Sequence, residues 1–269
     1  MTRIVLVGSS GRMGRTVAQC ASCTPGIDIV AGVDVRTDES SADAQFPLYS
    51  SLQHVNTKAD VLIDFSRPDS LESILTFCAH HKCGAVLATT GYTDVQTAEI
   101  SKASQDIPIF QAPNFSIGVA LLYELVKHAA SVLDAQYDIE IVERHHRSKR
   151  DAPSGTALGL ADAIRTVHPT LYNVYGRFGP DMRRQNEEIG VHAVRGGSLV
   201  GEHEVMFLSN GEELDIAHRA YSKDVFAQGA LKAAEFIADK ECGMYTMHNL
   251  LEALGLRQRT PSEPTPDSP

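Results

Sequence analysis

The sequence predicts an α/β protein with two domains, an N-terminal Rossmann-type dinucleotide-binding domain and an α+β domain built on a mixed sheet. Three observations support this fold class. Short β-branched runs alternate with helical patterns over the first 115 residues, which is typical of βαβ units around a parallel sheet. A glycine-rich turn follows the first of these runs. From residue 138 onward the strands are longer and few helices separate them, which indicates a mixed or antiparallel sheet.

The expected elements follow from these patterns in chain order. The first domain is expected to contain a helix over 12–21 and strands at residues 3–7, 27–33, 61–65, 85–89 and 107–111. The second domain is expected to contain a helix over 157–167 and strands at 138–144, 191–195, 203–208 and 213–220. Two further helical patterns, 226–239 and 247–254, close the fold.

We place residues 1–116 and 227–256 in the dinucleotide-binding domain and residues 117–226 in the second domain. The remaining segment, 257–269, has four prolines among its thirteen positions and almost no apolar side chains. A segment of this composition cannot bury enough apolar surface to offset the entropy lost on folding. We therefore expect 257–269 to be a disordered tail.

The composition excludes several classes of protein. The chain has 269 residues, of which 43% are hydrophobic and 22% charged, and its formal net charge is −10. It has no apolar run of the roughly 18 to 20 residues that a membrane span needs, and a strand-like run stands where a signal peptide would begin. The acidic balance and the absence of tryptophan argue against nucleic acid. We expect a cytoplasmic protein that binds neither membranes nor nucleic acid.

The cysteines and histidines do not suggest a metal site. Five cysteines are an odd and low number for this length, which favours reduced thiols over a disulfide framework. Cys20 and Cys23 form the only close pair, and no second CxxC or CxxH motif follows them. The histidine pairs 80–81 and 145–146 lack the i, i+4 spacing or the clustered carboxylates of a metal site.

The glycine-rich turn runs from Gly8 to Gly14 as G-S-S-G-R-M-G. Its spacing is GxxGxxG, because Ser10 stands where the common fingerprint has its second glycine. A strand precedes the turn, a helix follows it, and Asp34 ends the next strand twenty residues beyond Gly14. In this context the backbone N–H groups bind a pyrophosphate, and the carboxylate accepts hydrogen bonds from a ribose 2′-OH. The alternative is a turn needed only for helix packing.

The segment from Glu143 to Thr156, E-R-H-H-R-S-K-R-D-A-P-S-G-T, has the composition of an active site. Four Lys or Arg and two His fall within the seven residues 144–150. A cationic cluster on an acidic protein implies a small anionic ligand. The Ser154-Gly155-Thr156 turn precedes a helix, so its free backbone N–H groups could hold a carboxylate or a phosphate.

His145 and His146 are expected to point to opposite sides, because side chains alternate along an extended backbone. Either histidine could act as a general acid or as an anchor for a carboxylate. Lys149 would supply a fixed positive charge or a second proton. A serine-hydrolase interpretation fails because Ser154 stands in a Pro-Ser-Gly helix-capping sequence and not in a G-x-S-x-G elbow.

Five motifs in this order resemble the 4-hydroxy-tetrahydrodipicolinate reductase family, and the similarity covers essentially the whole chain apart from the tail. They are V-G-S-S-G-R-M-G at the start, A-T-T-G at 88–91, A-P-N-F-S-I-G-V at 112–119, the histidine run at 143–157, and V-G-E-H at 200–203. The resemblance implies an NAD(P)H-dependent oxidoreductase of the diaminopimelate route to lysine. It also implies a substrate-binding and oligomerisation role for the second domain, and a homotetramer.

The resemblance also implies roles for single residues. His145 is expected to be the catalytic acid and Lys149 the second proton donor. The cyclic dicarboxylate substrate is expected to contact His146, Ser154, Gly155, Thr156 and Lys223, although Lys223 stands where an arginine is common and lacks its bidentate fork. The cofactor is expected to contact Gly8, Ser9, Ser10, Gly11, Arg12, Met13, Asp34, Arg36, Ala88, Thr89, Thr90, Ala112, Pro113, Asn114 and Phe115.

Cofactor preference depends on two residues of opposite charge. Asp34 disfavours the 2′-phosphate of NADPH by like-charge repulsion, whereas Arg36 could pair with it. We expect the protein to use both NADH and NADPH, with a slight preference for NADH because Val35 stands where some relatives carry a basic residue. Two alternatives remain: another two-domain dehydrogenase acting on a dicarboxylate or amino acid, and a dinucleotide-binding regulator without turnover. The histidine pair, the lysine and the anion-binding turn in one loop favour the reductase.

Overall fold

The computed structural model describes residues 1–35, 45–133 and 136–255, and within them the chain divides into two compact units. The first unit contains Met1–Gly14, Thr24–Pro113 and 230–255, and the second contains Arg15–Cys23 and Asn114–Gly229. The predicted tail, 257–269, lies outside the described residues, as does Arg36. Within the described part, no helix is both long and apolar enough to cross a membrane.

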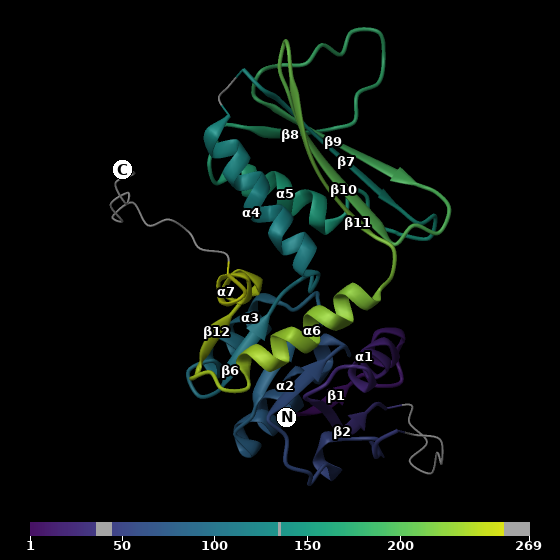
Figure 1. Ribbon diagram of the computed structural model, residues 1–269, viewed down its shortest axis with the longest axis vertical. Helices are drawn as coiled ribbons and strands as arrows, with labels where there is room; N and C mark the ends of the chain where they lie inside the picture. The colour runs from purple at the N-terminus through teal and green to yellow at the C-terminus, as the bar shows by residue number, and fades with distance from the viewer. Residues whose placement is uncertain (36–44, 134–135, 256–269) are drawn as a thin grey trace, which may run out of the picture. The chain divides into compact units, whose positions relative to one another are not determined.

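The first unit is built on a seven-stranded sheet whose strand pairs are all parallel (Figure 1). Its order is β12-β6-β5-β4-β1-β2-β3. The strands are β1 (Thr2–Val7), β2 (Ile27–Val33), β3 (Leu48–Tyr49), β4 (Val61–Asp64), β5 (Gly84–Leu87), β6 (Pro108–Gln111) and β12 (Gly243–Tyr245). Because β1 pairs with β2 on one side and β4 on the other, the crevice at its carboxyl end is the usual ligand site of such a sheet.

Helices pack on both faces of this sheet. On one face α2 (Leu71–His81) contributes Ile74 and Phe77, and α3 (Asp94–Ala103) contributes Ile100, to a core that includes alternate residues of the strands. On the other face α6 (Asp224–Ile237) places Phe236 edge-on against Phe110, with ring centroids 6.1 Å apart. The remaining helical elements here are α7 (Met247–Ala253) and the 3-10 turns η1 (Leu52–His54) and η2 (Pro68–Ser70), whereas most of α1 (Arg12–Ser22) belongs to the second unit. Burial of apolar faces on both sides explains why these strands are almost continuously hydrophobic.

The second unit contains a mixed five-stranded sheet in the order β11-β10-β7-β9-β8. Its strands are β7 (Asp138–His145), β8 (Tyr172–Tyr175), β9 (Glu188–Arg195), β10 (Gly201–Leu208) and β11 (Glu213–Ala220). β10 is antiparallel to β7 and β11, whereas β9 is parallel to β7 and β8. Figure 1 shows α4 (Ile117–Val132) and α5 (Gly155–Arg165) together on one face of this sheet.

The fold class predicted from the sequence is confirmed: a parallel Rossmann-type sheet is followed by a mixed sheet. Three short strands, β3, β8 and β12, and the helices α2, α3 and α4 were not among the expected elements, and β9 begins three residues before its predicted start. Short strands of two to four residues carry too little alternation to stand out from loops. All five cysteines are free thiols.

Candidate active site

On the face of strand β7 that α4 and α5 cover, the side chains are apolar at the start of the strand and polar at its end. Ile139 and Ile141 are buried in the apolar core, and the next two residues on the same face are Glu143 and His145. All four point to one side because side chains repeat every second residue along a strand. Glu143 is fully buried and His145 is 8% exposed. The apolar core therefore gives way to a buried polar group at the carboxyl end of β7.

The neighbouring strands complete this polar group. Arg195 of β9 lies beside His145 in the sheet register, and His203 of β10 lies opposite Glu143. Glu143 Oε2 lies 2.6 Å from His145 Nδ1, and both Glu143 oxygens accept from the Arg195 guanidinium at 2.7 Å. The backbone N–H of Ser154 donates to Glu143 Oε1 at 2.9 Å. One carboxylate thus links two strands to the start of α5.

Burial governs the charge of the two histidines at this site. It lowers the pKa of His145, although the hydrogen bond to Glu143 acts in the opposite direction. His203 is 4% exposed, and burial together with nearby His145 lowers its pKa to about 3, so its ring is neutral. The two rings stand edge to face with centroids 5.1 Å apart. His203 Nε2 also lies 2.9 Å from Ser154 Oγ.

The N-terminus of α5 has the geometry expected of an anion-binding turn. Ser154 is its N-cap, and its Oγ accepts from the N–H of Ala157 at 3.2 Å. Gly155 is exposed, and a Cβ placed there would meet no atom within 4 Å, so the helix start is open at this residue. Asn114 Nδ2 donates to Thr156 Oγ1 at 3.2 Å. The structure thereby joins a predicted cofactor residue to a predicted substrate residue.

His146 and Lys149 lie in the loop between β7 and α5. His146 is half-buried, and its Nδ1 lies 2.9 Å from Ser148 Oγ, so its environment differs from that of buried His145. Lys149 is also half-buried, and its Nζ lies 2.9 Å from Asp151 Oδ2. Lys223 precedes α6, where its carbonyl accepts from Phe226 at 3.1 Å. This backbone hydrogen bond does not test whether the Lys223 side chain contacts a substrate carboxylate.

The glycine-rich turn of the first unit is closely packed. Gly8 has φ +77°, and a Cβ on it would lie 2.5 Å from the carbonyl oxygen of Phe65. A Cβ on Gly14 would lie 2.1 Å from the carbonyl oxygen of Gly8. The turn therefore requires glycine at both positions. Ser9 Oγ is buried and has no partner within the described part of the chain, so the turn offers a polar atom as well as backbone donors to a dinucleotide.

The other predicted cofactor residues of the first unit gather at the same edge of its sheet. Asp34 follows β2, Ala88 follows β5 and Ala112 follows β6, and the carboxyl ends of parallel strands meet at one edge. Asp34 Oδ2 accepts from the N–H of Ser10 at 3.2 Å, which ties the acidic residue to the turn. The donor set, with backbone N–H groups beside a carboxylate, fits a dinucleotide.

Comparison with known proteins decides the family. The model of the dihydrodipicolinate reductase N-terminus matches residues 2–115, and that of the C-terminus matches residues 118–251. The chain belongs to the dihydrodipicolinate reductase family. As the sequence analysis expected, it is a 4-hydroxy-tetrahydrodipicolinate reductase, an oxidoreductase of lysine biosynthesis.

Relatives within this reductase family cover nearly the whole chain. The 4-hydroxy-tetrahydrodipicolinate reductase of Caldanaerobacter subterraneus subsp. tengcongensis is 46% identical over 94% of this chain and 99% of its own. That of Clostridium tetani is 45% identical over 94% of this chain and 98% of its own. A dipicolinate-bound dihydrodipicolinate reductase from Paenisporosarcina sp. TG-14 has the same fold, with TM-score 0.76 and 24% identity over 91% of this chain and 97% of its own.

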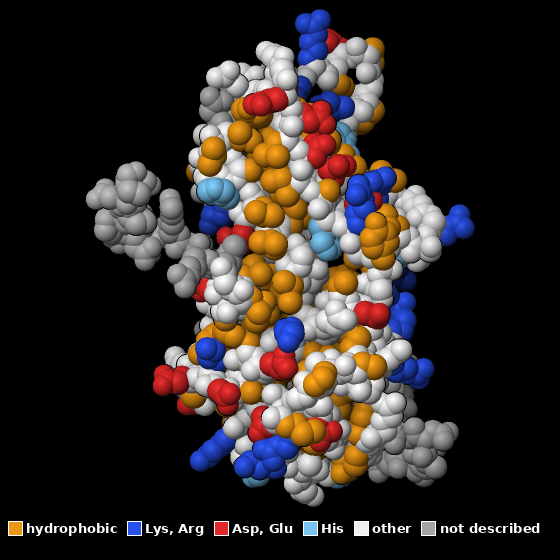
Figure 2. All heavy atoms as spheres, viewed as in Figure 1, with side chains coloured by type: hydrophobic (Ala, Val, Ile, Leu, Met, Phe, Trp, Pro, Cys, Tyr) orange, Lys and Arg blue, Asp and Glu red, His pale blue; other side chains and the backbone are white. Residues whose placement is uncertain are grey.

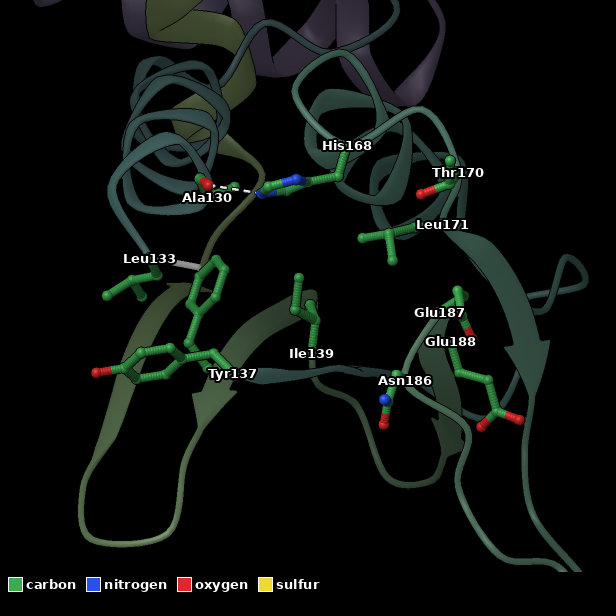
Figure 3. Close-up of a pocket in the computed structure, with 11 residues that line it drawn as sticks. Ala130, Leu133, Tyr137, Ile139, His168, Thr170, Leu171, Asn186, Glu187 and Glu188 are labelled. Atoms are coloured by element: carbon green, nitrogen blue, oxygen red, sulfur yellow. Dashed lines mark hydrogen bonds between the residues drawn. The ribbon is translucent and has the colours of Figure 1, made fainter. Parts of the chain in front are cut away.

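A cavity in the second unit lies away from the reductase residues described above. It has a volume of about 180 Å³ and is lined by residues of α4, of the α5–β8 connection and of the start of β7, among them Ile139 and His168 (Figure 3). His168 Nε2 is held by the carbonyl oxygen of Ala130 at 2.8 Å. Ile139 and His145 stand six residues apart at opposite ends of β7, so this cavity belongs to a different part of the sheet.

Four polar residues of these sites were not predicted from the sequence. Glu143 and His203 lie inside the motifs that carry the family resemblance, whereas Arg195 and Asp64 lie in predicted strands outside those motifs. Asp64 is fully buried at the end of β4, where it accepts from the N–H of Ser66 at 2.8 Å, and burial raises its pKa. A charged residue in phase with apolar residues of one strand, as in Ile139-x-Ile141-x-Glu143, is a signal that could have identified Glu143.

Proposed function

We propose that the protein reduces 4-hydroxy-tetrahydrodipicolinate, through its dehydrated form, to tetrahydrodipicolinate with NADH or NADPH. The observation that carries this proposal is the meeting of a buried, carboxylate-bound histidine with a capped helix N-terminus at one end of the second sheet. A proton donor and an anion-binding turn are what the protein itself must add to a nicotinamide hydride donor to reduce a cyclic dicarboxylate.

The chemistry assigns a task to each group. When bound, the reduced nicotinamide supplies a hydride to C4 of a ring whose C=C bond is conjugated to an imine. Negative charge then spreads over the ring nitrogen and the adjoining carbons, and a single proton completes the reduction. His145 and Lys149 stabilise that charge, and this pair supplies the proton. His146, Lys223 and the backbone N–H groups of Gly155 and Thr156 hold the two substrate carboxylates, with Ser154 fixing the start of the helix.

A coupled assay tests this function. The purified protein is combined with a dihydrodipicolinate synthase, pyruvate and aspartate semialdehyde, and nicotinamide absorbance is followed at neutral pH. We expect oxidation of NADH and of NADPH only when the synthase is present. If neither cofactor is oxidised, the proposal is wrong.

The space around His145 gives a second test. A Cβ on Gly201 would lie 2.9 Å from His145 Nε2, so the change Gly201→Ala must displace the ring. We expect kcat to fall roughly tenfold, a fraction of the ~10²- to 10⁴-fold that a positioned proton donor contributes. Gly196→Ala is the matched control, because a Cβ there meets no atom within 4 Å. Equal activity of the two variants in the coupled assay would contradict a catalytic His145.

Cofactor choice is assigned to Asp34, with Arg36 as the possible partner of a 2′-phosphate. We expect Asp34→Ala to raise KM for NADH more than KM for NADPH, by roughly tenfold, about the value of one hydrogen bond to a charged group. Because the Asp34 carboxylate also holds the N–H of Ser10, Asp34→Asn is the control that keeps an acceptor and removes only the charge. Asp34→Asn should lower KM for NADPH. Equal losses for both cofactors in Asp34→Ala would overturn the assignment.

We further propose a cytoplasmic homotetramer assembled through the second unit. The outer strands of its sheet are β8 and β11, and an outer strand has unpaired backbone groups that soluble proteins tend to cover. Tyr172 and Tyr175 of β8 are exposed. Figure 2 shows apolar side chains over α4, whose Leu121 and Leu125 are exposed. Sedimentation velocity should give four times the mass of the 29.2 kDa chain; a monomer would contradict the proposal.

A further inference from the structure

Glu143 is a fully buried carboxylate whose hydrogen-bonding capacity is used on every side. Oε1 accepts from Arg195 Nη2 at 2.7 Å and from the N–H of Ser154 at 2.9 Å. Oε2 accepts from Arg195 Nη1 at 2.7 Å and lies 2.6 Å from His145 Nδ1. The Arg195 fork is bidentate, the geometry that fixes a carboxylate most firmly. Neither the carboxylate nor the His145 ring can turn without breaking one of these bonds.

Packing alone does not account for a carboxylate at this place. Burying a charge and its partner removes both from water at a cost that their attraction often only offsets, and an apolar pair of similar volume often gives equal or greater stability. The face that carries Glu143 is apolar before it, with Ile139 and Ile141, so a third aliphatic side chain would continue the core. What an aliphatic side chain cannot provide is an acceptor for His145 Nδ1.

We propose that Glu143, locked by Arg195, is a positioning residue that holds His145 with Nδ1–H toward the protein and Nε2 toward the substrate, and that stabilises the protonated ring. The inference rests on the proposed role of His145 as proton donor. With Nδ1 committed to Glu143, the exchangeable proton is the one on Nε2. Nε2 is also the atom next to Gly201, where the missing Cβ leaves room for it.

The charged and titratable groups around His145 act on it in opposite directions. Burial lowers the pKa of His145, Glu143 raises it, and Lys149 and Arg195 lower it. His203 on β10 is neutral and adds no charge, and Asp151 is paired with Lys149. Of these groups, Glu143 therefore opposes the effect of burial on the pKa of His145 and favours the protonated ring. Its own pKa stays below the ordinary value because Arg195, His145 and the Ser154 N–H outweigh its burial.

The test uses Glu143→Gln, which keeps the shape of the side chain and removes the charge. With selectively ¹⁵N-labelled histidine, long-range ¹H–¹⁵N spectra give the tautomer and pKa of His145, and the spectrum of His145→Gln assigns its signal. We expect the variant to lose the Nδ1–H tautomer as the dominant neutral form and to show a lower His145 pKa. Protonated His145 is the active form, so kcat/KM falls as pH rises through the pKa of His145. In the variant this fall should occur at lower pH than in the unmodified enzyme. kcat should fall roughly 10- to 100-fold, within the contribution of a general acid, with substrate KM within about twofold.

Glu202→Gln is the matched control. Glu202 is also a buried glutamate on this sheet, but among the residues that the structure describes its side-chain partners are Arg144 and Arg219 and no histidine. It should lower the melting temperature and leave the His145 titration unchanged. If Glu143→Gln does not fold, Arg195→Lys is used for the same measurement, because it keeps the positive charge and loses the bidentate fork. Arg195→Lys should also alter the titration of His145.

The outcomes separate this inference from the proposed function. An unchanged tautomer and pKa of His145 in Glu143→Gln, or in Arg195→Lys where that variant is the one that folds, would overturn the positioning role. If the titration changes as expected but His145→Gln keeps full activity in the coupled assay, the positioning holds and the catalytic role of His145 is wrong.

Discussion

Replacing Lys149 by alanine is expected to lower kcat by roughly 10²- to 10⁴-fold, the range that a positioned proton donor contributes. The side chain lies half-buried in the loop that joins the histidines to α5, with Nζ 2.9 Å from Asp151. Steady-state kinetics with the synthase-coupled assay measures the effect, and substrate KM should also rise, because a cation near the carboxylates is lost.

Two further variants separate proton donation from charge. Lys149→Arg keeps a positive charge but cannot release a proton near neutral pH, so it should restore KM and leave kcat low. Arg150→Ala removes an exposed neighbouring cation and should leave both constants within about twofold. If Lys149→Arg recovers kcat, Lys149 acts through its charge alone and does not donate the proton.

The sequence predicted most of the fold because long, strongly patterned segments determine it. The predicted ends of β1, β2, β4, β5 and β6 lie within two residues of the observed ends. These strands were recognisable because buried parallel strands are continuous apolar runs. The helix start at Ser154 was visible as a capping sequence, and the capping bond from Ala157 is present. The three short strands were not visible, because each depends on pairing with a distant strand.

The polar network around His145 could be predicted only in part. His145 and Lys149 lie in one dense motif, and composition alone marks it. Arg195 stands 52 residues after Glu143 along the chain, and only the parallel pairing of β7 with β9 brings them together. The neutral state of His203 follows from its burial, a tertiary property that no local pattern encodes. Residues such as Arg195 and His203, which reach His145 only through strand pairing, are therefore hard to predict from local sequence patterns.

Replacing Arg195 by methionine is expected to cost about 3–5 kcal/mol of unfolding free energy near neutral pH, because it leaves a buried carboxylate without its cation. The bidentate pair with fully buried Glu143 is lost, while His145 and the Ser154 N–H remain as partners. Arg219→Met is the control, since buried Glu202 keeps Arg144 as a partner. Because Arg219 is half-exposed and water screens its charge, Arg219→Met should cost much less unfolding free energy than Arg195→Met.

The sign of the pH dependence distinguishes an unpaired charge from a packing defect. In the unmodified protein the folded-state pKa of Glu143 is below its ordinary value, so its contribution to stability is present above the unfolded-state pKa and is lost as pH falls through the folded-state pKa. Without Arg195, burial becomes dominant and raises the folded-state pKa, so stability is lost as pH rises through that raised value. The difference in unfolding free energy between the two proteins, measured by urea denaturation, should therefore shrink as pH falls from about 8 to about 5. A difference that stays constant over this range would mean that Arg195 stabilises the sheet by packing and not by holding the charge of Glu143.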